Sequence, residues 1–169
     1  VTQRACPAVT CPLDTLFDIP GMVGHLARAA GAEDAATRLG QYGQTNGFIR
    51  EDIARYLETD LAIRAAAEDI IVTVGCQEAM LLLLMGLFEP SRDALLVADP
   101  AYVGITGPAQ ILGIQLCPVP QDLDGLHPAA VSRAAAEVRA RGLVPRAFYH
   151  VPTFNNPLGT SMAASARRE

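Results

Sequence analysis

The sequence predicts an α/β fold, with a mostly parallel sheet and helices on both of its faces. Short runs of β-branched and apolar residues alternate with longer runs rich in Ala, Leu and Met, and Gly or Pro separates them. Alternation of this kind is typical of parallel strands that are connected by crossover helices. Half of the 169 residues are hydrophobic and 18% are charged, which is typical of a folded domain with a substantial core.

The N-terminal part of the chain, residues 1–40, predicts an irregular arm. Prolines interrupt its beginning, and the run over residues 24–30 predicts one short helix that ends at a glycine. A polar, turn-rich loop follows over residues 40–47. Residues 50–61 then predict an amphipathic helix, because their apolar side chains recur at helical spacing: Ile53, Leu57 and Leu61.

The remaining chain predicts four buried strands and the helices between them. Each strand is a short apolar run bounded by turn residues. The final helix is expected to begin at Ser161, whose hydroxyl is a good N-cap. The predicted strands are Ile70–Val74, Ala94–Ala98, Ile114–Val119 and Arg146–Val151, and the predicted helices are Gln77–Phe88, Val103–Leu112 and Pro128–Arg141.

A candidate anion site follows the first predicted strand. Gly75 stands where the strand turns into a helix, so the first backbone N–H groups of that helix are left without intrahelical acceptors. Gly75, Cys76 and Gln77 are therefore candidates to hold a phosphate. The alternative is an ordinary strand–helix turn whose helix start is only hydrated, because the segment lacks both the Walker and the dinucleotide-binding patterns.

Two further polar loops are expected at the same edge of the sheet. One follows the second strand over residues 99–102, and the other follows the fourth strand over residues 155–159. Ligands of open α/β sheets bind beyond the carboxyl ends of the strands. If the strands are parallel, the three loops converge on one crevice.

These segments resemble fold-type I pyridoxal-phosphate enzymes, and more closely class I/II aminotransferases of the kynurenine or 2-aminoadipate aminotransferase kind. The likeness begins at Gln41 and runs to Arg168, so it covers most of the chain. It rests on segments that occur in family order: Tyr42 to Gly47, Arg50 to Leu57, Gly75-Cys76-Gln77-Glu78-Ala79, Asp99-Pro100-Ala101-Tyr102, Asp122-Leu123-Asp124-Gly125-Leu126, and Asn156-Pro157-Leu158-Gly159.

The resemblance implies a site for pyridoxal 5'-phosphate and a role for each matching residue. Gly75, Cys76 and Gln77 match the turn that binds the cofactor phosphate. Tyr102 matches the aromatic residue that stacks on the pyridine ring, and Asn156 matches the residue that hydrogen-bonds its phenolic oxygen. Tyr42 matches a tyrosine that reaches the phosphate of the neighbouring subunit in a homodimer. The structural alternatives are a small buried Cys76, a core Tyr102, a ligand-free turn at Asn156 and a solvent-facing Tyr42.

The implied function is transfer of an amino group between an amino acid and a 2-oxo acid. Residues 41–169 would then form the N-terminal part of the cofactor-binding large domain. In the family, the Schiff-base lysine lies downstream of the segment matched by residues 156–159, whereas this sequence contains no lysine. We therefore expect a fragment that holds no catalytic residue of its own and is inactive alone. The link from Gly47 to Arg50 also looks about two residues shorter than in the family.

Three alternatives to an aminotransferase remain. The same domain serves as the effector-sensing part of transcription regulators with a winged-helix DNA-binding domain, although residues 1–40 are neither long nor basic enough to supply one. A lysine-free, non-catalytic partner subunit would carry the same segments. The third alternative is another reaction on the same cofactor, such as decarboxylation or elimination.

Overall fold

The computed structural model describes residues 14–36 and 49–168. These fall into two compact units, residues 14–73 and residues 74–168, which are described separately below. The predicted boundary between an arm and a large domain, at residues 40 and 41, lies outside the described residues and stays a prediction.

In the first unit, α1 (Ile19–Ala30) begins five residues earlier than the helix predicted over residues 24–30. A short 3₁₀ helix, η1 (Asp14–Leu16), precedes it. The earlier start follows from Asp18, whose Oδ1 accepts a hydrogen bond of 3.1 Å from the Gly21 N–H, and from Pro20 in the first turn.

Helix α3 (Arg50–Leu61) has the predicted bounds. It ends at Ala62, which adopts the left-handed conformation with φ of 55°, and the Ile63 N–H donates to the Leu57 carbonyl at 2.9 Å. A second 3₁₀ helix, η2 (Ala67–Asp69), lies against α3, because Arg50 Nη1 donates to the Ala67 carbonyl at 3.2 Å.

The strand predicted over Ile70–Val74 is wrong, since these residues form none in the structure. Ile70 is extended, with φ of −97° and ψ of 127°, as its β-branched side chain favours. A strand also needs a hydrogen-bonded neighbour, and none of the described strands pairs with this segment. Ile71 and Val74 are accordingly 71% and 89% exposed rather than buried.

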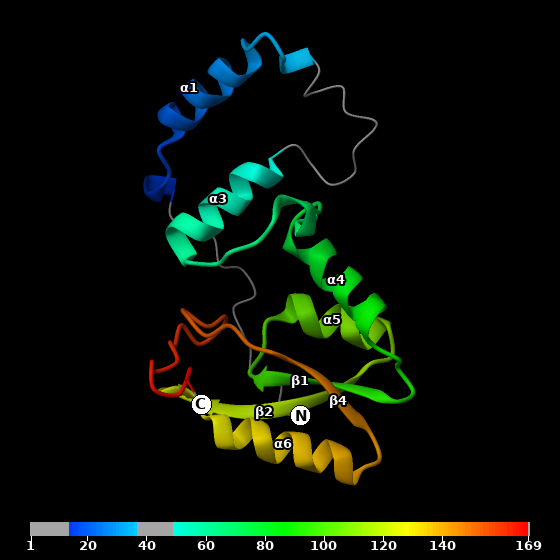
Figure 1. Cartoon of the computed structure of the whole chain (residues 1–169). Helices are drawn as coiled ribbons and strands as arrows, with labels where there is room; N and C mark the ends of the chain where they lie inside the picture. The colour runs from blue at the N-terminus through cyan, green and yellow to red at the C-terminus, as the bar shows by residue number, and fades with distance from the viewer. Residues whose placement is uncertain (1–13, 37–48, 169) are drawn as a thin grey trace. The chain divides into compact units, whose positions relative to one another are not determined.

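The second unit contains the predicted sheet, in the order β3-β2-β1-β4, and Figure 1 labels β1, β2 and β4. Strand β1 (Asp93–Asp99) is central and pairs in parallel with β2 (Gln115–Asp122) and β4 (Val144–Tyr149). Strand β3 (Gly125–Leu126) folds back antiparallel on the end of β2. The mostly parallel sheet is thus confirmed, and the strand predicted to end at Val119 continues to Asp122, where the short hairpin with β3 begins.

Helices cover both faces of the sheet, as predicted (Figure 1). Helices α4 (Cys76–Leu87) and α5 (Val103–Ile111) lie on one face, and α6 (Pro128–Ala140) lies on the other. Side chains of β1 alternate between two apolar clusters because successive strand residues point to opposite faces. Ala94 and Leu96 join the α6 cluster, with Val119, Ala134 and Val138, whereas Leu95 and Val97 join the α4–α5 cluster, with Leu84, Ile105 and Ala109.

The helix predicted to begin at Ser161 is wrong within the described residues. Residues 164–167 form only a turn. The Ser161 hydroxyl accepts a hydrogen bond from the Phe154 N–H at 3.0 Å, so it closes a loop instead of capping a helix. Across the part of the chain that the structure describes, no helix has the length and apolar character needed to traverse a bilayer.

Candidate functional site

The loops that follow β1, β2 and β4 meet at the carboxyl edge of the sheet. Gln121, near the end of β2, links them: its Nε2 donates to the Pro100 carbonyl after β1 at 2.9 Å and to Asn155 Oδ1 after β4 at 3.4 Å. Because the three strands are parallel, their carboxyl ends share one edge, which is where open α/β sheets bind ligands.

The N-terminus of α4 has the geometry of an anion site. Gly75 has φ of +82°, a conformation that favours glycine, and no atom lies within 4 Å of the position that a Cβ would occupy there. No side chain caps the helix. The N–H groups of Cys76 and Gln77 lie in its first turn, where an α-helix provides no acceptor. Cys76 is exposed, which removes the alternative of a small buried core residue.

One acidic side chain stands beside this helix start. The Glu78 carboxylate accepts a hydrogen bond of 2.5 Å from the Val74 N–H, one residue before the N-cap. This contact resembles the reciprocal half of a capping box, and it fixes how the chain enters the helix. It leaves the first-turn N–H groups of Cys76 and Gln77 available to a ligand.

Gln77 and Tyr102 meet at Gly104, in the first turn of α5. Gln77 Nε2 donates to the Gly104 carbonyl at 2.6 Å, which leaves its second hydrogen for a ligand. A Cβ at Gly104 would overlap the Tyr102 ring and lie 2.6 Å from Gln77 Oε1. Tyr102 is half-buried and packs on the edge of the α4–α5 cluster. The predicted phosphate and ring-stacking residues are thus neighbours.

Tyr149, the last residue of β4, lies in the same place. Burial raises the pKa of its phenol, and the nearby Cys76 thiol and Tyr102 hydroxyl raise that pKa further. The phenol therefore stays protonated at neutral pH and keeps its O–H donor.

The loop that carries Asn156 is held from both sides. Asn155 is 4% exposed, and its N–H donates to the Thr160 carbonyl at 2.7 Å while its own carbonyl accepts from the Gly159 N–H at 2.5 Å. Arg167 Nη2 donates to the Pro152 carbonyl at 2.8 Å. Asn156 itself is half-buried, next in sequence to the residue that Gln121 binds.

The sequence alone assigned no role to Gly104, Gln121 or Tyr149, and it placed Asn155 only within a polar loop. Gly104 was visible only as a glycine in an apolar helix, and Gln121 only as a polar residue after the strand predicted to end at Val119. Their contacts join segments that are far apart in the chain, so no local pattern marks them. Tyr42 lies outside the described residues.

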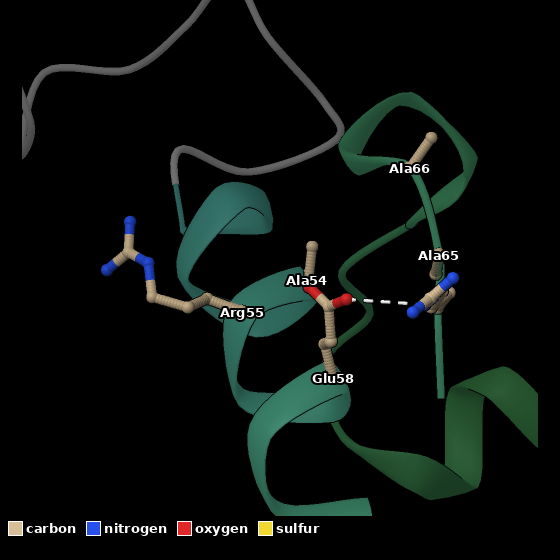
Figure 2. A pocket seen from close by; sticks show the side chains of 6 residues that line it. Ala54, Arg55, Glu58, Ala65 and Ala66 are labelled. Carbon is tan, nitrogen blue, oxygen red and sulfur yellow. Dashed lines mark ion pairs between the residues drawn. The ribbon is translucent and has the colours of Figure 1, made fainter. Parts of the chain in front are cut away.

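A hollow of about 490 Å³ lies against α3 in the first unit. Figure 2 shows Arg55 pointing away from Glu58, and a dashed line marks the ion pair of 3.4 Å between Glu58 and Arg64. Those two side chains are 62% and 89% exposed, so the pair contributes little and any charge there is screened. We assign no ligand to this hollow.

A second pocket, of about 530 Å³, lies beside α6 and contains His150, Phe148 and Arg167. Burial, and then the charge of Arg167, lowers the pKa of His150, whose ring stacks on Phe148 at a centroid distance of 5.7 Å. Both ring nitrogens of His150 are buried without a hydrogen-bond partner among the described residues, and we assign no ligand to them. Among the described residues, no group of His, Cys, Asp and Glu is arranged to hold a metal ion.

Comparison with models of protein families identifies the family of this chain. Residues 19–166 match the model for aminotransferases of class I and II. The chain belongs to this family. Class I and II aminotransferases depend on pyridoxal 5'-phosphate, and the family uses it to transfer amino groups. The predicted family, fold and cofactor are confirmed.

Individual relatives agree with the family model. The chain is 44% identical over 137 residues to (S)-3,5-dihydroxyphenylglycine transaminase of Amycolatopsis orientalis, covering 80% of this chain and 31% of that protein. It superposes on kynurenine aminotransferase of Pyrococcus horikoshii with a TM-score of 0.80 and 27% identity, covering 93% of this chain and 38% of that one.

A transcription regulator is also among the relatives. The chain is 33% identical over 121 residues to the uncharacterized HTH-type regulator YjiR of Escherichia coli, covering 71% of this chain and 24% of that protein. In each of these comparisons, the chain spans between about a quarter and two fifths of the length of the relative.

Proposed function

We propose that this chain provides the part of a pyridoxal-phosphate-dependent aminotransferase that holds the cofactor phosphate and ring. The observation that carries the proposal is the uncapped N-terminus of α4 beside Tyr102, joined through the contact between Gln77 and Gly104. An open helix start binds a phosphate, and an adjacent aromatic ring supports a flat heterocycle, so the residues present fit this cofactor.

Each residue has one task in this proposal. The N–H groups of Cys76 and Gln77, with the second hydrogen of the Gln77 amide, bind the phosphate. Gly75 permits the close approach, because any Cβ at its φ of +82° is strained. Tyr102 fixes the plane of the pyridine ring, and Asn156 donates its amide hydrogen to the phenolic oxygen. When bound, the cofactor supplies the electron sink for amino-group transfer.

The substrates in this proposal are an amino acid and a 2-oxo acid. Relatives whose names specify dihydroxyphenylglycine, aromatic amino acids or kynurenine make aromatic amino acids the first donors to test. We also propose a cytoplasmic homodimer, in which Tyr42 of one subunit reaches the phosphate of the other and which serves amino-acid metabolism.

Amino-group transfer is the direct test of the proposed function. The intact protein, loaded with pyridoxal 5'-phosphate, is expected to convert aromatic amino acids to their 2-oxo acids and to convert the added 2-oxo acid acceptor to its amino acid.

Replacement of Gln77 by alanine is expected to weaken cofactor binding about tenfold, since it removes one hydrogen bond to a charged group. Binding measured by titration of the cofactor absorbance, with no difference between Gln77→Ala and wild type, would contradict the phosphate assignment.

The similarity to YjiR supports one alternative function, that of an effector-sensing domain. An effector-sensing domain would bind the same cofactor and would need a DNA-binding segment elsewhere in the protein. Cofactor binding without amino transfer from any donor, together with sequence-specific DNA binding by the intact protein, would favour that function. A non-catalytic partner subunit would show neither property.

A further inference from the structure

The end of β2 is connected to the loop after β4 across an intervening strand. Strand β1 lies between β2 and β4, and neighbouring strands are about 4.8 Å apart, so a side chain on β2 must pass the end of β1 to reach the β4 loop. Gln121 makes this crossing. Its amide nitrogen contacts Pro100 after β1 and Asn155 after β4 at the same time.

The orientation of both amides is fixed by backbone carbonyls. Pro100 O can only accept, so it selects the Gln121 NH₂ group rather than Oε1. The Asn155 Nδ2 donates to the Val151 carbonyl at 3.2 Å, which turns Asn155 Oδ1 toward Gln121. The two hydrogens of Gln121 Nε2 are therefore divided between one acceptor on each loop.

We propose that Gln121 is a positioning residue that sets the spacing between Tyr102 and Asn156. Pro100 precedes Tyr102 by two residues, and Asn155 directly precedes Asn156. The inference rests on the proposed function: the loop after β1 supports the ring of the cofactor, and the loop after β4 meets its phenolic edge. The Gln121 amide holds the two loops at one separation and so determines how the ring is oriented.

The side chain at this position needs two donors and a specific length. Methionine has a similar length but no donor. Glutamate has the same length, but its ionised carboxylate only accepts, so it would face two acceptor oxygens. Asparagine keeps both donors, but it is one methylene shorter and cannot reach the β4 loop from the same backbone position.

The experiment measures binding of pyridoxal 5'-phosphate to the intact protein by absorbance, and ring orientation by the circular dichroism of the bound cofactor. Gln121→Met and Gln121→Asn are expected to weaken binding about tenfold and to change the dichroism of the fraction that remains bound. Gln121→Glu is expected to weaken it further. Gln115, exposed at the opposite end of β2, provides the control, and Gln115→Met should match wild type in both measurements.

Thermal unfolding identifies any variant that fails to fold. If Gln121→Met is unfolded, Gln121→Asn provides the test instead. Folded Gln121 variants with wild-type affinity and dichroism would overturn the inference while leaving the proposed function intact. A wild-type protein that binds no pyridoxal 5'-phosphate would instead overturn the proposed function, and the inference with it.

Discussion

Replacing Asp93 by asparagine is expected to lower the thermal unfolding temperature by about 10 °C or more. The Asp93 side chain is completely buried at the start of β1, and its carboxylate accepts from Arg92 Nε at 3.0 Å and from Arg146 Nε at 3.1 Å. It also accepts from the Glu89 N–H at 2.9 Å. Asparagine removes the negative charge, and its NH₂ group would face donors on three sides.

The exposed Asp124 in the same unit provides the matched control. Asp124→Asn should unfold within about 2 °C of wild type, because surface substitutions of this kind change stability little. Unfolding of Asp93→Asn at the wild-type temperature, measured by circular dichroism or calorimetry, would show that the buried carboxylate contributes no net stability.

The same carboxylate predicts a pH dependence of stability. Hydrogen bonds from Arg92 and from the Glu89 N–H, followed by the contact with Arg146, hold the pKa of Asp93 well below its usual value. A lowered native pKa means that the stabilisation is complete above the pKa of the unfolded chain, about 4, and is lost as the pH falls further. Stability of the wild type should therefore decline below about pH 4.

The stability of the Asp93→Asn variant should still decline below about pH 4, but by less than the stability of the wild type. A hydrogen bond from His127 also lowers the pKa of Asp122, so a second carboxylate contributes in the same direction. Chemical unfolding measured between about pH 2 and pH 7 separates the two contributions. Identical pH profiles of stability for wild type and Asp93→Asn would contradict the assignment of this pH dependence to Asp93.

Replacing Gly104 by alanine is expected to weaken binding of pyridoxal 5'-phosphate about tenfold to a hundredfold without unfolding the protein. The new Cβ would overlap the Tyr102 ring and the Gln77 amide, so the ring-stacking and phosphate-binding side chains must both move. Stability is expected to change little, because alanine favours the helix by about 1 kcal/mol over glycine and offsets part of the strain.

Gly107 provides the matched control, because it lies in the same helix and no atom outside its chain neighbours lies within 4 Å of the position of its Cβ. Gly107→Ala is expected to bind the cofactor as wild type does. Its stability should change little, because the helix propensity gained with alanine is offset by the contact of its Cβ with the following Pro108. If titration by absorbance gave the same affinity for Gly104→Ala and Gly107→Ala, Tyr102 and Gln77 would not form one binding surface.

Local patterns in the sequence were sufficient to predict most of the elements of the second unit. The apolar run at residues 94–98 is buried on both faces, whereas in the run at residues 114–119 Ile114, Cys117 and Val119 are buried and Gln115 and Pro118 are exposed. The parallel pairing of the two strands follows from the helix between them. Residues 70–74 have the same composition, but pairing depends on a neighbour and not on the run itself. The sequence therefore predicted the extended backbone of Ile70 correctly and the pairing of this segment incorrectly.

The candidate site was predictable only where its residues lie in short segments. Gly75 and Tyr102 stand at turns after apolar runs, and resemblance to a family gives them roles. Gln121 and Gly104 act through contacts with residues 21 to 34 positions away, for which the sequence holds no periodic signal. Nothing in the sequence indicated that Asp93, just before the predicted strand at residues 94–98, is buried, because its partner Arg146 lies on another strand.

The crystal structure of the intact protein with bound pyridoxal 5'-phosphate is the measurement that tests the central claim most directly. We expect the phosphate within hydrogen-bond distance of the Cys76 and Gln77 N–H groups, the pyridine ring against Tyr102, and its phenolic oxygen at Asn156. A phosphate bound away from the start of α4, or a ring that contacts neither Tyr102 nor Asn156, would contradict it.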